Sequence, residues 1–82
     1  MAKKWLYHYG DDTIKVINKN FDGSELYING ELRDRKKGIS LRDCLKTVLE
    51  SGETVTATLE GLVTMGCSLC IDGKPQEPVE VE

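Results

Sequence analysis

The sequence predicts an α+β domain in which antiparallel β-hairpins are covered by one amphipathic helix, at about residues 40–51. Three observations lead to this prediction: alternation of apolar and polar residues along most of the chain, two Asn/Asp-Gly pairs, and one segment with helical periodicity. With 82 residues, the chain is expected to form a single domain, residues 1–82. An all-β sandwich is the alternative.

The first part of the chain predicts two hairpins. Residues 5–9 alternate with three aromatic side chains on one side, and residues 13–17 form a β-branched run, as is typical of paired strands. Residues 25–28 and 31–33 are joined by Asn29-Gly30, a pair that favours a type I′ turn because both residues tolerate positive φ. The strand over residues 31–33 is short and polar, so we expect it at a sheet edge.

Residues 40–51 have the clearest helical period in the chain. Apolar residues fall at spacings of three, four, seven and eight, which form one face of a helix: Leu41, Cys44, Leu45, Val48 and Leu49. Ser40 with Asp43 can cap the beginning of the helix, and Gly52 can take the left-handed position after its end. Val48 and the Thr-rich run that follows also fit a strand, which keeps the all-β alternative open.

The last part of the chain predicts two further strands. Residues 53–59 alternate cleanly, and residues 67–71 end at Asp72-Gly73, a second type I′ turn signal. Two prolines interrupt residues 75–82, which we expect to be either an edge strand or a frayed tail.

Two hairpins of the chain share the pattern Leu-x-Ile-(Asn/Asp)-Gly-charged: residues Leu26–Glu31 and Leu69–Lys74. They predict two similar β units, packed face to face or side by side. Together with Trp5, these hairpins resemble the small β-sandwich domain of Fas apoptosis inhibitory molecules, and that resemblance implies a non-catalytic protein-binding domain. The segment over residues 40–51 departs from the family's all-β pattern. The chain also resembles many small bacterial proteins to which no activity is assigned.

Composition and charge narrow the functional classes. The net charge of −3 is split between +2 for residues 1–38 and −5 for residues 39–82, an asymmetry that can bias docking or self-association. We expect neither a secretory signal nor a membrane-spanning segment. Three cysteines without the spacing of a disulfide framework predict a reducing compartment, so we expect a cytoplasmic protein with no membrane partner.

The cysteines raise the question of a zinc site. Cys67-x-x-Cys70 with Cys44 and His8 would supply a Cys3His ligand set. Residues three apart on a strand point to opposite faces, however, and lie about 10 Å apart. We therefore expect no metal and no cofactor, and keep a structural zinc-binding domain as an alternative.

A cluster of basic residues follows the second predicted hairpin: Arg33, Arg35, Lys36 and Lys37. Beside the aromatic residues Trp5, Tyr7, Tyr9 and Tyr27, it could form a weak site for single-stranded nucleic acid. The sequence pI of about 5.1 argues against that function.

No catalytic motif accompanies the lone His8 or any cysteine, so we expect no enzyme. Leu62, Val63 and Met65 lie in a Gly-flanked loop and form a candidate interaction patch. The predicted function is a small non-catalytic module for binding or assembly, with an unidentified protein or a second copy of the chain as its partner. Sheet edges near residues 31–33 and 79–82 could accept that partner as an added strand.

Overall fold

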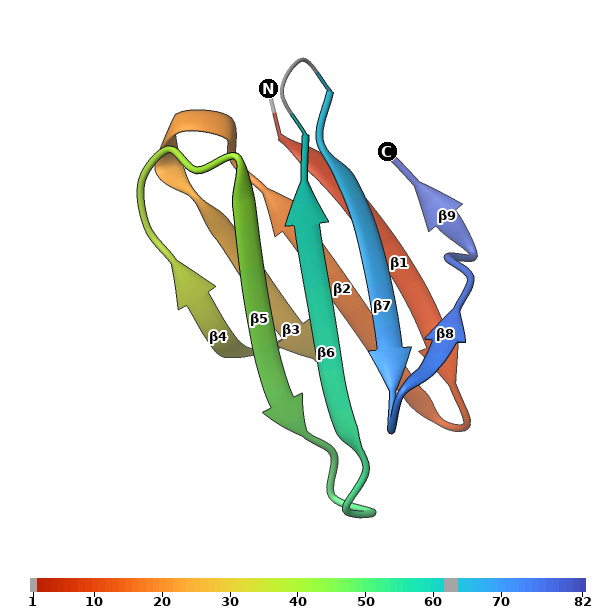
Figure 1. Cartoon of the computed structure of the whole chain (residues 1–82). Helices are drawn as coiled ribbons and strands as arrows, with labels where there is room; N and C mark the ends of the chain where they lie inside the picture. The colour runs from red at the N-terminus through yellow and green to blue at the C-terminus, as the bar shows by residue number, and fades with distance from the viewer. Residues whose placement is uncertain (1, 62–63) are drawn as a thin grey trace.

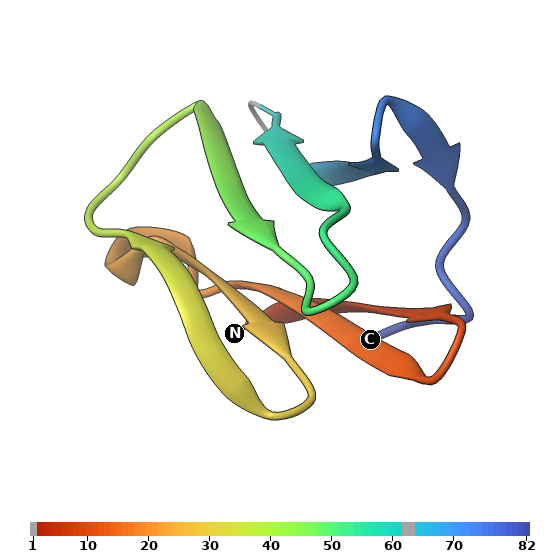
Figure 2. The same cartoon turned by 90° about the horizontal axis from the view of Figure 1, so that it is seen from below.

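The chain folds into two antiparallel β-sheets packed face to face (Figures 1 and 2), described by a computed structural model for residues 2–61 and 64–82. The elements are β1 (Lys3–Tyr9), β2 (Asp12–Asn18), the 3-10 turn η1 (Asn20–Asp22), β3 (Ser24–Ile28), β4 (Glu31–Lys36), β5 (Arg42–Val48), β6 (Thr54–Glu60), β7 (Gly66–Ile71), β8 (Lys74–Gln76) and β9 (Glu80–Val81). Sheet A has the order β4-β3-β2-β1-β9, and sheet B has the order β5-β6-β7-β8. Among the described residues, no helix has the length and apolar character needed to cross a bilayer.

The α+β prediction, with its helix over residues 40–51, is wrong, and the alternative all-β sandwich is the observed fold. The helical stripe required Leu41 and Val48 to be buried, yet they are 60% and 54% exposed. Instead β5 alternates, with Asp43 and Leu45 buried and Cys44 exposed. Seven residue pairs with β6 give this segment backbone hydrogen bonds and a buried face, whereas a helix this short is marginal in water.

The two sheets repeat one structural unit, as the sequence pattern predicted. Asn29-Gly30 and Asp72-Gly73 both adopt positive φ, at 51° and 83° and at 49° and 80°. The N–H of Thr13 donates to Asn29 Oδ1 and the N–H of Asn29 donates to the Thr13 carbonyl, both at 2.8 Å. Thr54 and Asp72 make the same two bonds at 2.9 Å. Each unit is therefore a four-stranded meander, and β9 is added to the first.

The core lies between the inner faces of the two sheets. Its buried members are mostly aliphatic, with two aromatic residues from β1: Trp5, Tyr7, Ile14, Val16, Leu26, Ile28, Leu45, Leu49, Val55, Ala57, Leu59, Leu69 and Ile71. Alternate residues of the strands supply these side chains, because successive side chains of a strand point to opposite faces.

One side of the sandwich is closed by a β-bulge in β4. Leu26 pairs with Asp34 and Tyr27 with Leu32, so Arg33 has no opposite residue and points to the same side as Asp34. Arg33 Nη1 then donates to the carbonyl of Val48 at 3.1 Å, and Asp34 Oδ2 accepts from the N–H of Lys46 at 2.9 Å. These contacts occupy part of the free edge of β5 and remove it as a template for strand addition.

Apart from the link between β8 and β9, the described connections between strands lie at two opposite ends of the molecule. The apical end holds η1, the segment between β4 and β5 and residues 61, 64 and 65; the basal end holds the turns near residues 10–11, 29–30, 49–53 and 72–73 (Figure 1). The longest of the three principal-axis extents is 34 Å, and the others are 22 Å and 21 Å.

Gly23 joins η1 to β3, and a substitution there tests how closely the backbone packs at the apical end. Its φ is +95°, and a Cβ there would lie 1.9 Å from the carbonyl oxygen of Lys36. We expect Gly23→Ala to lower the free energy of unfolding by at least about 3 kcal/mol, measured by chemical denaturation. Gly10→Ala is the control: its φ is also positive, at +58°, but no atom lies within 4 Å of the added Cβ. That variant should lose only about 1–2 kcal/mol, and equal losses would show that the clash is relieved.

Candidate functional site

Large apolar side chains are exposed together at the apical end. Phe21 on η1 is 76% exposed, and Ile39 and Leu41, in the segment between β4 and β5, are 73% and 60% exposed. Met65, which precedes β7, is partly buried against the core and borders the same region. These four residues are called the apical patch. Exposed apolar side chains that cluster in this way mark interaction surfaces, whereas single ones do not.

The apical patch surrounds a cavity of about 270 Å³, here called the apolar pocket. Its lining comes from all three apical connections and from the end of β2: Asn18, Asn20, Phe21, Ile39, Ser40, Leu41, Gly61 and Met65. A cavity of about 150 Å³ is enough to hold benzene in another protein, so the pocket has room for one large apolar side chain. Its polar groups are amides and a hydroxyl, which can donate and accept hydrogen bonds.

The backbone around η1 holds Phe21 outward. Asn18 Oδ1 accepts from the N–H of Asn20 at 3.1 Å, and the N–H of Lys19 donates to the carbonyl of Gly23 at 2.7 Å. Both contacts close the connection between β2 and β3 into a tight turn. The side chain at the centre of this turn does not face the core, so Phe21 remains exposed.

A buried chain of hydrogen bonds connects both sheets beneath this turn. Asn18 Nδ2 donates to Ser24 Oγ at 3.1 Å, and Ser24 Oγ donates to Asp43 Oδ2 at 3.0 Å. These residues belong to β2, β3 and β5, and all three are buried. Buried polar groups must be hydrogen-bonded, and here they bond one another across the sandwich. The chain fixes the position of the apical connections relative to the core.

A second depression of about 570 Å³, here called the basic hollow, also borders Phe21. Its lining is mainly charged: Lys19, Phe21, Asp22, Glu25, Arg35, Lys37 and Gly38. Phe21 lines both the apolar pocket and the basic hollow, so the two adjoin at this residue. An apolar and a charged binding region therefore lie next to each other.

Glu25 is the buried charged group of the basic hollow. Its carboxylate accepts from Lys19 Nζ at 3.0 Å, from Arg35 Nη2 at 3.1 Å and from the Tyr27 hydroxyl at 2.8 Å. Burial by itself raises the pKa of this carboxyl. The hydrogen bonds from Lys19 and Tyr27 and the charges of Lys19 and Arg35 outweigh burial and hold the pKa below its ordinary value.

The predicted interaction patch falls partly at this site. Leu62 and Val63 lie outside the described residues. Met65 lines the apolar pocket, and its carbonyl accepts a hydrogen bond from Lys3 Nζ at 3.1 Å. Of the predicted patch, Met65 therefore belongs to the apical patch, whose other members, Phe21, Ile39 and Leu41, the sequence analysis did not predict. A lone aromatic residue within a polar turn sequence was the signal that could have found Phe21.

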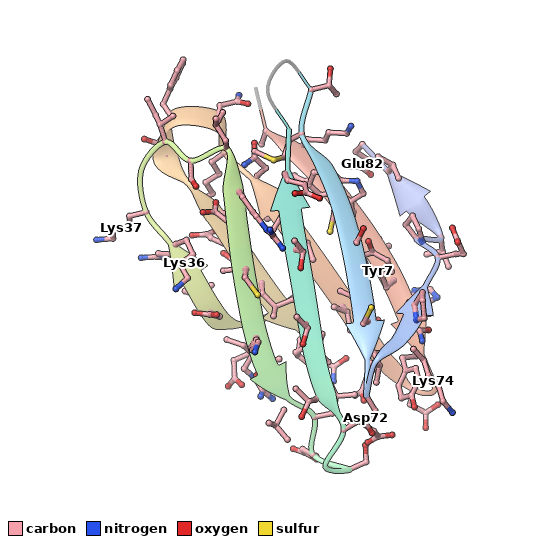
Figure 3. The ribbon with its side chains drawn as sticks, viewed as in Figure 1. Tyr7, Lys36, Lys37, Asp72, Lys74 and Glu82 are labelled. Carbon is pink, nitrogen blue, oxygen red and sulfur yellow. The ribbon has the colours of Figure 1, made fainter. Side chains whose placement is uncertain are left out.

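The predicted basic cluster is divided by the structure. Arg33 turns towards β5 and Arg35 pairs with Glu25, whereas Lys36 and Lys37 are exposed and point away from the sandwich (Figure 3). The aromatic residues proposed as stacking faces are also divided. Trp5 and Tyr7 are core residues, Tyr9 packs against the core, and Lys15 Nζ lies over the Tyr27 ring at 5.0 Å. These positions give no continuous platform for stacked bases.

The four candidate zinc ligands are spread over the molecule. Strand alternation places His8 on the outer face of sheet A, and Cys44 and Cys70 on the outer face of sheet B. Cys67 points inward, where the Tyr7 hydroxyl donates to its sulfur at 3.5 Å. Within residues 2–61 and 64–82, no group of three or more His, Cys, Asp or Glu side chains could hold a metal ion.

The inward position that brings Tyr7 and Cys67 together also limits the reactivity of both side chains (Tyr7 is labelled in Figure 3). Burial, the hydrogen bond to Cys67 and the nearby charges raise the pKa of Tyr7 far above its ordinary value. Burial also raises the pKa of Cys67, and the hydrogen bond from Tyr7 opposes this only in part. A thiol that is hard to ionise is a poor nucleophile.

We expect Cys67 to react with iodoacetamide at least about tenfold more slowly than the exposed Cys44, because reaction requires both access and the thiolate. Mass spectrometry of peptides from the alkylated native protein measures both rates, and alkylation in denaturant is the control. Equal rates in the native protein would contradict this account of Cys67.

We expect Glu25→Gln to lower the free energy of unfolding at pH 7 by about 2 kcal/mol, because hydrogen bonds to a charged group are lost. Since the pKa of Glu25 is depressed, its stabilisation is present above the unfolded-state pKa and disappears as the pH falls through the folded-state pKa. The difference from the wild type should therefore shrink below about pH 4. Glu80→Gln, at an exposed residue of β9, is the control and should change little. A Glu25→Gln deficit that stays constant down to pH 3 would show that the charge contributes nothing.

No family model, curated protein or solved structure matches this chain.

Proposed function

We propose that the protein is a non-catalytic binding module that holds a partner protein at the apical patch. The observation that carries this proposal is the convergence of Phe21, Ile39 and Leu41, each at least 60% exposed, around one pocket. Leaving three such side chains in water forgoes the stabilisation of about 1.5–3 kcal/mol that burying each one would give. A partner that covers them recovers this free energy.

The chemistry of the pocket supports binding rather than catalysis. Its described lining contains two asparagines and one serine as polar side chains, and no His, Cys, Asp or Glu. General acid–base or nucleophilic reactions need a titratable group or an activated nucleophile next to the reacting atom. Apolar walls with a few polar groups are instead typical of sites that anchor a side chain and orient its backbone.

The location of the pocket supports the same function. Residues from three connections contribute to it, and the hydrogen-bonded chain of Asn18, Ser24 and Asp43 holds the ends of β2, β3 and β5 together beneath two of them. Binding loops on a rigid β-sandwich lose little conformational entropy when a partner docks. A preformed surface of this kind is suited to a protein segment that brings one anchoring side chain.

We also propose a cytoplasmic location. All three cysteines are free, Cys44 is exposed, and Cys67 and Cys70 point to opposite faces of sheet B. The wild-type chain is therefore expected to keep its thiols reduced, as is usual in that compartment.

The proposal is tested by selecting linear peptides from a random phage-displayed library on the immobilised protein. We expect enriched peptides to lose at least about tenfold in affinity for Phe21→Ser/Ile39→Ser, because truncated anchors typically cost more than about 1 kcal/mol each. Calorimetry or fluorescence anisotropy measures the affinity.

Val79→Ser/Val81→Ser is the matched control, since these residues near the C-terminal edge of sheet A are 58% and 50% exposed. Peptides that bind the apical variant as well as the wild type, or that lose affinity only with the control variant, would refute the proposed site. Failure to enrich any peptide would also count against it.

A further inference from the structure

We propose that the partner segment carries a carboxylate next to its apolar anchor, so that the anchor enters the apolar pocket while the carboxylate occupies the basic hollow. This inference rests on the proposed function, because it names the class of segment that the apical patch would hold. It follows from three properties of the surface: the two depressions share Phe21 as a lining residue, the basic hollow has a net positive charge, and the basal end of the molecule is acidic.

The residue that the two depressions share limits the spacing that a ligand must have. Phe21 lines both depressions, so they adjoin there and one short segment can reach into both. Ile39 and Leu41 line only the apolar pocket, and Lys37 lines only the basic hollow. An apolar side chain and a charged group close together in one segment can therefore be satisfied at the same time.

The charge of the basic hollow favours an anion. Lys19 and Arg35 are paired with the buried Glu25, which leaves Lys37 and Asp22 as its other charged lining residues. Lys36 precedes Lys37 and is also exposed (Figure 3). Within the described part of the chain, neither lysine has a carboxylate within 4.0 Å. The lining of the basic hollow then carries three basic and two acidic side chains, a net charge of +1, and Lys37 is the basic residue among them that is not in an ion pair. An incoming carboxylate therefore meets a net positive surface.

The basal end carries the opposite charge. The basal turns and the residues that flank them hold six acidic residues and two basic ones: Asp11, Asp12, Glu31, Glu50, Glu53 and Asp72, with Arg33 and Lys74. Figure 3 shows Asp72 and Lys74 there, far from Lys36 and Lys37. The molecule extends over 34 Å, whereas charges are screened beyond about 8 Å at physiological ionic strength. The apical lysines therefore act on a partner without cancellation from the basal acids, and an acidic segment is directed to the apical end.

The size of the apolar pocket fits a single anchor. Its volume of about 270 Å³ exceeds the cavity of about 150 Å³ that holds benzene in another protein. An aromatic or branched aliphatic side chain fits this volume and meets the apolar side chains of Phe21, Ile39 and Leu41. We therefore expect the motif to be one Phe, Leu or similar residue with Asp or Glu beside it.

The test uses synthetic versions of peptides enriched from the random library. We expect these peptides to contain Asp or Glu beside an apolar residue and to bind about tenfold more weakly when Asn and Gln replace the acids. Lys36→Glu/Lys37→Glu should weaken the acidic peptide about tenfold or more, and added salt should reduce its affinity. Lys74→Glu is the matched basal control and should leave the affinity within about twofold.

Each outcome separates this inference from the proposed function. Peptides that depend on Phe21 and Ile39 but not on salt, on their own acids or on Lys36 and Lys37 would overturn the inference and leave the proposed function standing. Peptides that ignore Phe21 and Ile39 would overturn both. If sedimentation velocity shows concentration-dependent dimers that Phe21→Ser abolishes, the occupant is a second copy of the chain, and the acidic-segment inference fails.

Discussion

The burial of two sheet faces on each other is the constraint from which the rest of the structure follows. Each meander has one apolar face, formed by alternate residues such as Ile14 and Leu26 in sheet A and Val55 and Leu69 in sheet B. Neither face can remain in water, and two sheets of similar size cover each other without any helix. The type I′ turns at residues 29–30 and 72–73 set the register that brings these side chains inward.

The same packing separates the molecule into two ends with different roles. Three of the four basal turns span two residues each, whereas each apical connection spans five. The buried bonds from Asn18 through Ser24 to Asp43 join the strands from which the β2–β3 and β4–β5 connections emerge. A rigid scaffold with binding residues on its connections is how β-sandwiches commonly present binding surfaces. The apolar pocket is thus a consequence of how the connections join the strands.

The distribution of charge on this scaffold determines which partner the binding surface favours. Glu25 pairs with both Lys19 and Arg35 within the sheet surface, while Lys37 remains exposed in the hollow that Phe21 also lines. Apolar contact supplies most of the free energy of association, whereas unpaired charges select the partner and speed its approach. The division of charge between the two halves of the sequence falls instead between the two sheets, because β1–β4 form most of sheet A and β5–β8 form sheet B.

The sequence by itself determined the local structure: the hairpins, the two Asn/Asp-Gly turns and the internal repeat are encoded by residues next to one another. It did not determine residues 40–51, because Leu45 and Leu49 fit both a helical stripe and the inner face of a strand. Pairing with β6, which lies later in the chain, decided that segment. Likewise, the basic run did not show that the bulge turns Arg33 inward, or that Glu25 pairs with Arg35. The apical patch was missed for the same reason: Phe21, Ile39 and Leu41 are brought together only when the two sheets pack, and exposure depends on what the rest of the chain leaves uncovered.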